Sequence, residues 1–384
     1  MRILYLTADP GVPPLGGKGS SVHVRELVGA LVSSGASVVV ASPRTEASDE
    51  QLSGATLIGI SPVDPRSQPT LASLRAAVER QSTEIQRIAR QCDVEGIYER
   101  FSLFSEGGVL AARRLGIPHI LEINAPLRWE ARAFRSLTYH EEAAAIERRV
   151  LGATDRIFAV SDELATLLAS DGVDEAKIDV VPNGVDPAKV SARCARVAEG
   201  PFVVGFAGSL KPWHGVEVLA DACRRALMLL PDLRVEIVGD GPARSSVAAL
   251  AEHPRVTVHG QQTYAATFRL MSGWDAGLAP YLPLEHFYFS PLKVLEYMAS
   301  GLCPIASDLG QIRSLLGGGE RGELVEPADP RALATAILSL ASDRARAAAM
   351  GARAAQYVRT SHTWSHNARR AIAALRNCGV NAAA

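Results

Sequence analysis

A lysine and a glutamate, Lys293 and Glu296, lie three residues apart in an otherwise apolar segment at residues 288–301. The apolar side chains of this segment repeat with helical spacing at Leu292, Leu295, Met298 and Ala299. The first turn of a helix presents unpaired N–H groups and a partial charge of roughly +0.5 e, so it attracts anions, and Lys293 adds a full charge. Glu296 can accept hydrogen bonds from the hydroxyls of a sugar. The pattern favours an anion-binding helix, although a surface helix with a simple Lys–Glu pair would have the same spacing.

The ends of this helix are marked by particular residues. Ser290 is a favourable N-cap, and Pro291 suits the first helical position because the N–H that it lacks would be unpaired there anyway. Gly301 can adopt the left-handed conformation that often closes a helix. We therefore expect the helix to begin at Pro291 and to end just before Gly301.

Composition excludes several classes of protein. A chain of 384 residues is expected to form two domains, and a formal net charge of −1 gives no support to nucleic-acid binding. The five cysteines are scattered without C-x-x-C spacing, which favours a reducing compartment and no metal cluster. The first apolar run is too short for a signal peptide, and no apolar stretch approaches the roughly 18–20 residues that span a bilayer. We expect a cytoplasmic protein without a cofactor or metal.

The chain opens with a predicted strand at residues 2–7, a glycine-containing loop at residues 9–21, a helix and a second strand. This order predicts a doubly wound parallel sheet, with the loop at the ligand-binding edge. The loop matches neither the dinucleotide fingerprint nor the P-loop, because its glycines are misplaced for both. Gly16 and Gly17 would still let a phosphate or a sugar approach the backbone, whereas a loop without a ligand would have the same composition.

The segment at residues 288–301 resembles the family-4 retaining glycosyltransferases of GT-B architecture. Their hallmark is a pair of glutamates separated by seven residues. Glu296 matches the second glutamate, which in the family binds the ribose of a nucleotide sugar, while the first falls at Tyr288, which carries no charge. The resemblance implies that Ser290, Lys293 and neighbouring backbone amides, including those of Phe289 and Leu292, lie near the donor diphosphate.

Further positions follow from the same resemblance. The loop after the first strand of the second domain carries, in the family, an arginine and a lysine that reach the donor phosphates; here those places hold Ser209 and His214, with Lys211 between them. Lys211 would supply charge, and a protonated His214 could add to it. The turns that contain Gly239 and Gln261 resemble those that hold the nucleobase.

Asn124 takes a place where many relatives have a histidine that faces the reaction centre. An amide keeps the hydrogen bonds of that position but cannot act as a general base, although we count it among the catalytic candidates with Lys211 and His214. The charged segment at residues 128–151 reads as helical, and it could contact an acceptor or an anionic membrane. A solvated helix is the simpler interpretation.

The resemblance implies two Rossmann-like domains with parallel sheets that face each other across a cleft. The expected domains are an acceptor domain at residues 1–187, a linker at 188–200, a nucleotide-sugar domain at 201–362 and a helix at 363–384 that returns to the first domain. The implied reaction moves a hexose or amino-hexose, of the glucose or GlcNAc type, from a nucleoside diphosphate, most often UDP, to an acceptor hydroxyl on a natural product or glycan, with retention of configuration.

Three alternatives remain open at this point. A nucleotide-sugar epimerase of similar shape would release UDP from UDP-GlcNAc without an acceptor. A non-catalytic nucleotide-sugar binding protein would bind the donor without turnover, as the replacements at Tyr288, Ser209, His214 and Asn124 allow. A NAD-dependent dehydrogenase would need the fingerprint that the chain lacks.

Overall fold

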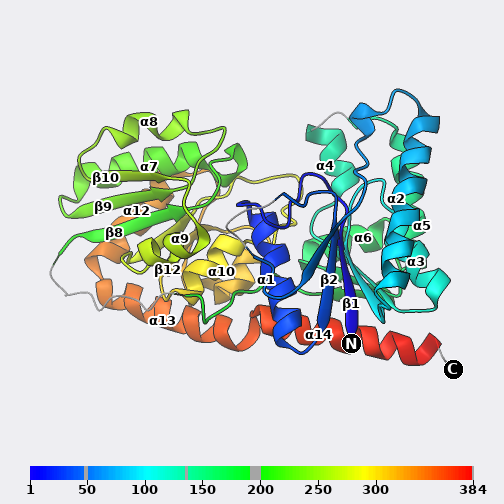
Figure 1. Ribbon diagram of the computed structural model, residues 1–384. Helices are drawn as coiled ribbons and strands as arrows, with labels where there is room; N and C mark the ends of the chain where they lie inside the picture. Colours follow the sequence, from blue (N-terminus) through cyan, green and yellow to red (C-terminus); the bar gives the residue numbers. More distant parts are fainter. Residues whose placement is uncertain (47–50, 135–136, 191–199, 383–384) are drawn as a thin grey trace. The chain divides into compact units, whose positions relative to one another are not determined.

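The computed structural model describes residues 1–46, 51–134, 137–190 and 200–382. The chain forms two compact units, each built on a parallel β-sheet, as Figure 1 shows. Unit 1 consists of Met1–Pro182, Tyr288–Ser290 and Trp364–Ala384. Unit 2 consists of Asn183–Phe287 and Pro291–Thr363. The predicted class, two Rossmann-like domains with parallel sheets, is confirmed.

The sheet of unit 1 has seven parallel strands in the order β3-β2-β1-β4-β5-β6-β7. Its strands are β1 (Arg2–Thr7), β2 (Ser37–Ser42), β3 (Thr56–Gly59), β4 (Gly96–Arg100), β5 (His119–Ile123), β6 (Arg156–Ala159) and β7 (Ile178–Val180). The central strands β1, β4 and β5 are almost entirely buried, because helices cover both faces of the sheet. The strand order reverses between β1 and β4, so the carboxyl ends of these two strands are the expected ligand-binding edge of unit 1.

Helices α1 (Gly19–Ser33) and α14 (Trp364–Ala382) pack together on one face of this sheet. There the rings of His23 and Trp364 meet edge to face, with centroids 4.8 Å apart. On the opposite face α3 (Gly107–Leu115) approaches β4 so closely that Gly108 leaves no room for a Cβ beside the Glu99 carboxylate. The remaining helices of unit 1 are α2 (Leu71–Gln91), α4 (Leu127–Phe134), α5 (His140–Ala153) and α6 (Asp162–Ser170).

The sheet of unit 2 has six parallel strands in the order β10-β9-β8-β11-β12-β13. Its strands are β8 (Phe202–Ala207), β9 (Leu233–Val238), β10 (Val256–Gly260), β11 (Ala276–Ala279), β12 (Cys303–Ser307) and β13 (Glu323–Val325). The helices are α7 (Val216–Leu229), α8 (Ser245–Ala251), α9 (Tyr264–Met271), α10 (Leu292–Ala299), α11 (Ile312–Leu315), α12 (Pro330–Ser342) and α13 (Arg344–Ser361). The order reverses between β8 and β11, so the carboxyl ends of these strands are the expected binding edge of unit 2.

Helix α10 is fixed across β8 and β11 by one buried tyrosine. The Tyr297 ring lies against Gly277, where no Cβ would fit. Its hydroxyl accepts the N–H of Ala207 at 2.8 Å and donates to the carbonyl of Leu278 at 3.3 Å. Tyr297 therefore joins the two strands at the point where the strand order reverses, and it sets the position of α10 on the sheet.

The unit boundaries differ from the domains that the sequence predicts at residues 183–187, 288–290 and 363. Residues 183–187 belong to unit 2, where the Val185 N–H donates to the His362 carbonyl at 3.0 Å and Val185 forms a parallel bridge with Thr363. The segment 288–290 belongs to unit 1. The predicted linker at residues 188–200 lies mostly outside the described residues, and the return of the last helix to unit 1 is observed from Trp364 onward.

The charged segment at residues 128–151 forms parts of two helices, α4 and α5, and not a single helix. Within the described ranges, no helix is both long enough and apolar enough to cross a lipid bilayer.

Candidate functional site

Helix α10 begins one residue later than the sequence predicts. Pro291 is the N-cap, with φ −76° and ψ 90°, and no side chain caps this end of the helix. The predicted start at Pro291 was wrong because a ψ of 90° lies outside the helical region. Gly301, with φ +70°, has the left-handed conformation that we expected.

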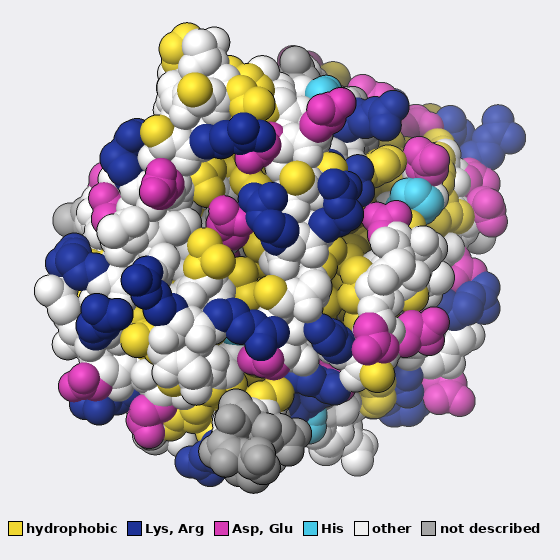
Figure 2. Space-filling view, turned by 90° about the vertical axis from the view of Figure 1, so that its right-hand side faces the viewer, with side chains coloured by type: hydrophobic (Ala, Val, Ile, Leu, Met, Phe, Trp, Pro, Cys, Tyr) yellow, Lys and Arg dark blue, Asp and Glu magenta, His cyan; other side chains and the backbone are white. Residues whose placement is uncertain are grey.

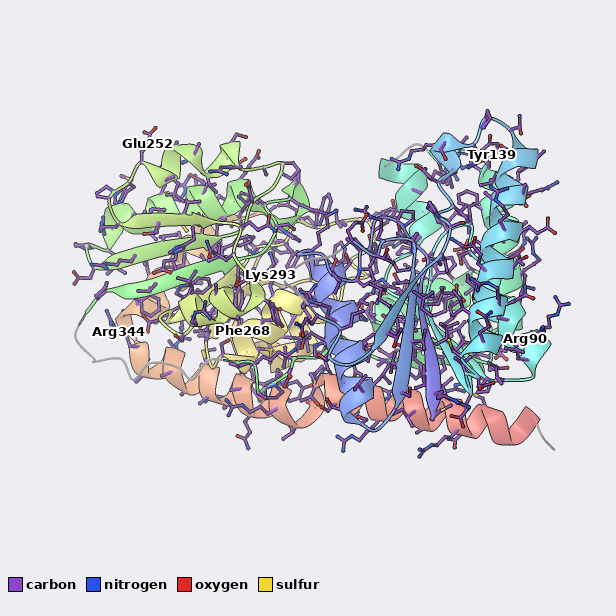
Figure 3. All side chains as sticks on the ribbon, in the orientation of Figure 1. Arg90, Tyr139, Glu252, Phe268, Lys293 and Arg344 are labelled. Atoms are coloured by element: carbon purple, nitrogen blue, oxygen red, sulfur yellow. The ribbon has the colours of Figure 1, made fainter. Side chains whose placement is uncertain are left out.

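Lys293 lies on the face of α10 that packs against the sheet, one turn before Tyr297. Figure 3 marks its position in unit 2. The ammonium nitrogen Nζ lies 4.0 Å from the centroid of the Phe206 ring, at the end of β8, and 5.0 Å from that of Tyr281, just after β11. Lys293 therefore brings a cation to the carboxyl ends of the two strands between which the strand order reverses.

The Lys293 ammonium is buried and has no hydrogen-bond partner among the described residues. Burial lowers the pKa of Lys293 to about 7, and the negative charge of Glu296 opposes this shift only in part. A buried ammonium that lacks hydrogen-bond acceptors is costly, so this position is suited to a ligand that supplies an anionic oxygen.

Glycines open the backbone beside this cation. A Cβ on Gly208 would lie 3.2 Å from the Lys293 Nζ, and Gly208 has φ +140°, which side chains rarely adopt. Gly239, with φ +133°, leaves no room for a Cβ next to the Gly208 carbonyl. The ends of β8 and β9 thus pack backbone to backbone, and Gly208 is exposed there beside the Lys293 ammonium.

His214 has a different chemical state from the one that the sequence suggested. Burial and the positive charge of Lys293 lower the pKa of His214 to about 3; Lys211 adds to the effect, and the hydrogen bond to the Ser209 carbonyl opposes it. A carbonyl oxygen can only accept, so the Nδ1 of His214 carries the proton and donates at 2.5 Å. His214 is therefore neutral in the free protein, because burial and the charge of Lys293 both disfavour its cation, and its protonation beside a diphosphate stays a prediction.

Lys211 lies at the N-cap of the 3₁₀ turn Pro212–His214, with its ammonium 4.7 Å from the centroid of the Trp213 ring. The backbone N–H of Lys211 donates to the Ser209 carbonyl at 2.9 Å. The Ser209 carbonyl therefore orders this loop by accepting hydrogen bonds from the His214 ring and the Lys211 N–H. The Ser209 side chain is exposed. The structure brings Lys211, His214 and Lys293 close enough for their charges to interact.

The other donor-binding candidates of unit 2 are more open. Glu296 is half-buried and close enough to Lys293 to raise its pKa. Leu292 is half-buried at the first turn of α10, and Gln261 is exposed directly after β10. Their predicted contacts with the donor stay predictions.

Tyr288 lies in unit 1 and its polar groups are already in use. Its hydroxyl donates to the Glu130 carboxylate, and its carbonyl accepts the Ser161 hydroxyl at 2.8 Å. The ring is buried against Trp129, with centroids 6.3 Å apart, and against Phe289. These contacts give Tyr288 a packing role that the sequence did not predict, and a donor contact by Tyr288, Phe289 or Ser290 stays a prediction.

The glycine loop of unit 1 is held in place by α1. Arg25 donates to the Gly16 carbonyl, and a Cβ on Gly16 would lie 2.7 Å from Pro13 and from the Ser21 hydroxyl. Gly17 is exposed. The loop is thus fixed at Gly16 and exposed at Gly17, and the predicted approach of a ligand to these two glycines stays a prediction.

A buried polar network lies next to Asn124 at the carboxyl edge of the unit 1 sheet. Glu122 accepts from the Tyr98 hydroxyl at 2.8 Å and contacts the His23 Nε2 at 2.9 Å, and Arg100 lies 3.7 Å away. Burial alone would raise the pKa of Glu122, but His23, Arg100 and Tyr98 outweigh it and keep this pKa below its usual value. Asn124 has a buried Oδ1 without a hydrogen-bond partner among the described residues.

His23, Tyr98 and Glu122 have no role that the sequence predicted. The available signal was a glutamate inside the apolar strand His-Ile-Leu-Glu-Ile, because a charge within a buried strand needs partners. Those partners come from β4 and α1, which sequence spacing alone does not bring together. Among the described residues, no group of three or more His, Cys, Asp or Glu side chains could hold a metal ion.

Two doubly wound parallel sheets in one chain are the architecture of the GT-B fold, and in the second sheet a buried cation lies where the strand order reverses. The model of "Glycosyltransferase Family 4" matches residues 17–189, and the model of "Glycosyl transferases group 1" matches residues 201–343. The chain belongs to the family-4 glycosyltransferases and is an enzyme of this class.

Similar proteins agree with this assignment. D-inositol 3-phosphate glycosyltransferase from Rhodococcus jostii is 28% identical over 307 residues, which cover 74% of this chain and 67% of the relative. Sucrose-phosphate synthase from Thermosynechococcus elongatus has a similar structure, with TM-score 0.74, 20% identity and full coverage of both chains. The Anabaena protein HepE, solved in complex with UDP and glucose, has TM-score 0.73 and 18% identity over 98% of this chain and all of its own.

Proposed function

We propose that this glycosyltransferase transfers a hexose or amino-hexose from a UDP-sugar to a hydroxyl of a bacterial natural product or glycan, with retention of configuration. The observation that carries the proposal is the buried Lys293 ammonium, which lies at the reversal point of the unit 2 sheet and has no hydrogen-bond acceptor among the described residues. The diphosphate of a nucleotide sugar would supply that acceptor. HepE was solved with UDP and glucose, which supports this class of donor.

The chemistry would rest on the charge that develops on the departing diphosphate. Lys293 and Lys211 would stabilise that charge, and the backbone around Gly208 would let the phosphate oxygens approach. His214 is neutral and would help by holding the loop at Ser209 and not by its charge. Glu296 would accept hydrogen bonds from the ribose. We propose front-side substitution, in which the leaving diphosphate helps to deprotonate the acceptor, and no metal takes part.

The first experiment is a thermal-shift panel with UDP, GDP, ADP, dTDP and their common sugars. A ligand at about 100 times its Kd stabilises a protein by about 2.7 kcal/mol, which is readily detected. We expect the largest shift with a uridine nucleotide, and we expect Lys293→Met to remove it. The matched control is Lys189→Met, because Lys189 is an exposed lysine of the same unit.

The product then separates the alternative functions. A transferase releases UDP only when an acceptor is present, whereas an epimerase releases UDP from UDP-GlcNAc alone. Binding without release of UDP under a broad acceptor screen would favour a binding protein. A panel without any shift, or a shift that Lys293→Met leaves unchanged, would refute the proposed donor site.

A further inference from the structure

The outer face of unit 1 carries a groove between helices α2, α3 and α5, which we call the α2 groove. Its volume is about 920 Å³, and it lies wholly within unit 1. The α2 residues that line it recur at every third or fourth position from Arg75 to Gln91. Residues with this spacing lie on one continuous face of the helix, which is about 24 Å long at a rise of 1.5 Å per residue. The face is long enough to contact a partner helix over about four turns.

Three apolar side chains line the α2 groove among polar and charged ones. They are Leu110 of α3, which is 42% exposed, Val78 of α2, which is buried, and Ala145 of α5. Among the described residues no aromatic side chain lines the groove. Sugars and single-stranded nucleic acids usually stack on aromatic rings, so this lining disfavours both as ligands.

The three helices that form the groove are joined by contacts across it. Arg75 of α2 pairs with Glu142 of α5 at 2.7 Å. Arg149 of α5 pairs with Glu106 at the start of α3 at 2.9 Å. Arg114 of α3 donates to Gln86 of α2 at 3.0 Å. The groove is therefore preformed, so that a partner would not have to order it.

The unbalanced charge of the groove is positive and lies toward one end. Arg87, Arg90 and Arg114 form no ion pair with any residue that the structure describes, whereas Arg75 and Arg149 have carboxylate partners. Glu79 of α2 also lines the groove without an ion pair to a described residue, so the unpaired arginines outnumber the unpaired carboxylate. Figure 2 shows Lys and Arg side chains around apolar atoms on this face of the molecule, and Figure 3 labels Arg90. A ligand that complements the groove has an apolar stripe and carboxylates beside it.

We infer that the α2 groove is a docking site for an acidic amphipathic helix of a partner protein. The apolar stripe of that helix covers Leu110 and Val78, and its carboxylates pair with Arg87, Arg90 and Arg114. A lipid surface fits less well, because it is flat, while this site is a groove between three helices. The donor site of unit 2 is not involved, so this inference is independent of the proposed function.

The test uses the full chain and a labelled synthetic peptide as the probe. The peptide is a helix of about sixteen residues with leucines along one face and glutamates beside them, matched to the length of the groove. A peptide of equal composition, shuffled so that it has no apolar stripe, is the control for charge alone. Binding is measured by fluorescence anisotropy at roughly 150 mM salt, where exposed charges are well screened.

Two triple variants test the arginines. Arg87→Glu, Arg90→Glu and Arg114→Glu together are expected to weaken binding of the patterned peptide by about 30-fold. The control variant reverses the charge of three exposed arginines of unit 1 outside the groove, Arg80, Arg369 and Arg376. It has the same change in net charge and is expected to change binding by less than about twofold.

A single variant tests the apolar contact. Leu110→Ala, at an exposed position, is expected to weaken binding by about fivefold and guards against a folding defect in the triple variant.

Several results would overturn the inference. One is equal affinity for the patterned and shuffled peptides, and another is an equal loss in the two triple variants. The inference also fails if the patterned peptide does not bind while vesicles of phosphatidylglycerol and phosphatidylcholine do, with a loss in the groove variant, because the groove face would then be a membrane contact.

Discussion

The affinity for the donor should fall as the pH rises above 7, because the Lys293 ammonium loses its proton there. Burial lowers the pKa of Lys293 to about 7 in the free protein. Below that pH the free and bound forms both carry the cation, so the affinity is constant. Above it the free side chain is neutral, and binding of a diphosphate must take up a proton before the ion pair can form.

The size of the effect follows from the pKa. Each pH unit above the pKa of the free protein costs up to about 1.36 kcal/mol of binding free energy, as long as the bound lysine stays protonated. Between about pH 6 and pH 8.5 the expected loss is about 2 kcal/mol, or roughly 30-fold in Kd. At about pH 8 binding should take up about 0.9 proton per nucleotide sugar.

Isothermal titration calorimetry measures both quantities. The Kd of the preferred nucleotide sugar is followed across this pH range, and proton uptake is obtained at one pH in two buffers with different ionisation enthalpies. A nucleotide sugar is used and not the free diphosphate, because its two phosphates are both esterified and do not titrate in this range. The Lys293→Met variant should bind more weakly and show neither the slope nor the proton uptake, while Lys189→Met should keep both.

A Kd that stays constant across the pH range would refute this reasoning. So would an equal slope in Lys293→Met, since the titrating group would then be another residue. His214 cannot replace Lys293 in this account, because its pKa of about 3 keeps it neutral throughout the range.

Three further predictions follow from the site. Glu296→Ala should weaken nucleotide-sugar binding by about 1.5–3 kcal/mol in a calorimetric titration, as for hydrogen bonds to a charged group, and unchanged affinity would make Glu296 structural. Lys211→Ala should lower kcat more than it raises KM in steady-state kinetics if Lys211 stabilises the leaving group, and a change in KM alone would contradict that role. Tyr288→Phe removes the hydroxyl that donates to the Glu130 carboxylate and should cost about 1 kcal/mol of stability in a denaturant titration. The Kd of the nucleotide sugar for the same variant tests the predicted contact: a weaker Kd would support it, and an unchanged Kd would leave Tyr288 a packing role alone.

Much of the fold could be predicted from the sequence because it depends on local signals. Apolar strands alternate with helices along both halves of the chain, and such an alternation has one common solution, a parallel sheet with helices on both faces. The helix that carries Lys293 was visible from its apolar spacing and from Gly301, although its first residue was misplaced by one. The order of the motifs indicated the family, which the family models confirm.

Contacts between residues far apart in the chain could not be predicted in this way. Tyr288 belongs to a short connection whose sequence does not show which unit it packs against, and the structure places it on Glu130 and Ser161. His23 and Glu122 meet only because α1 covers the face of the sheet on which Glu122 lies. Neither contact leaves a periodic signal in the sequence.

The sequence by itself determined the helices and strands, the parallel direction of the strands within each sheet, and the presence of a lysine at the start of α10. Only the tertiary structure decided the chemical states of the site. Burial lowers the pKa of Lys293 to about 7, and desolvation together with the positive charge of Lys293 lowers that of His214 to about 3. The pKa of a side chain depends on desolvation and on nearby charges, and both arise only when distant segments of the chain pack together.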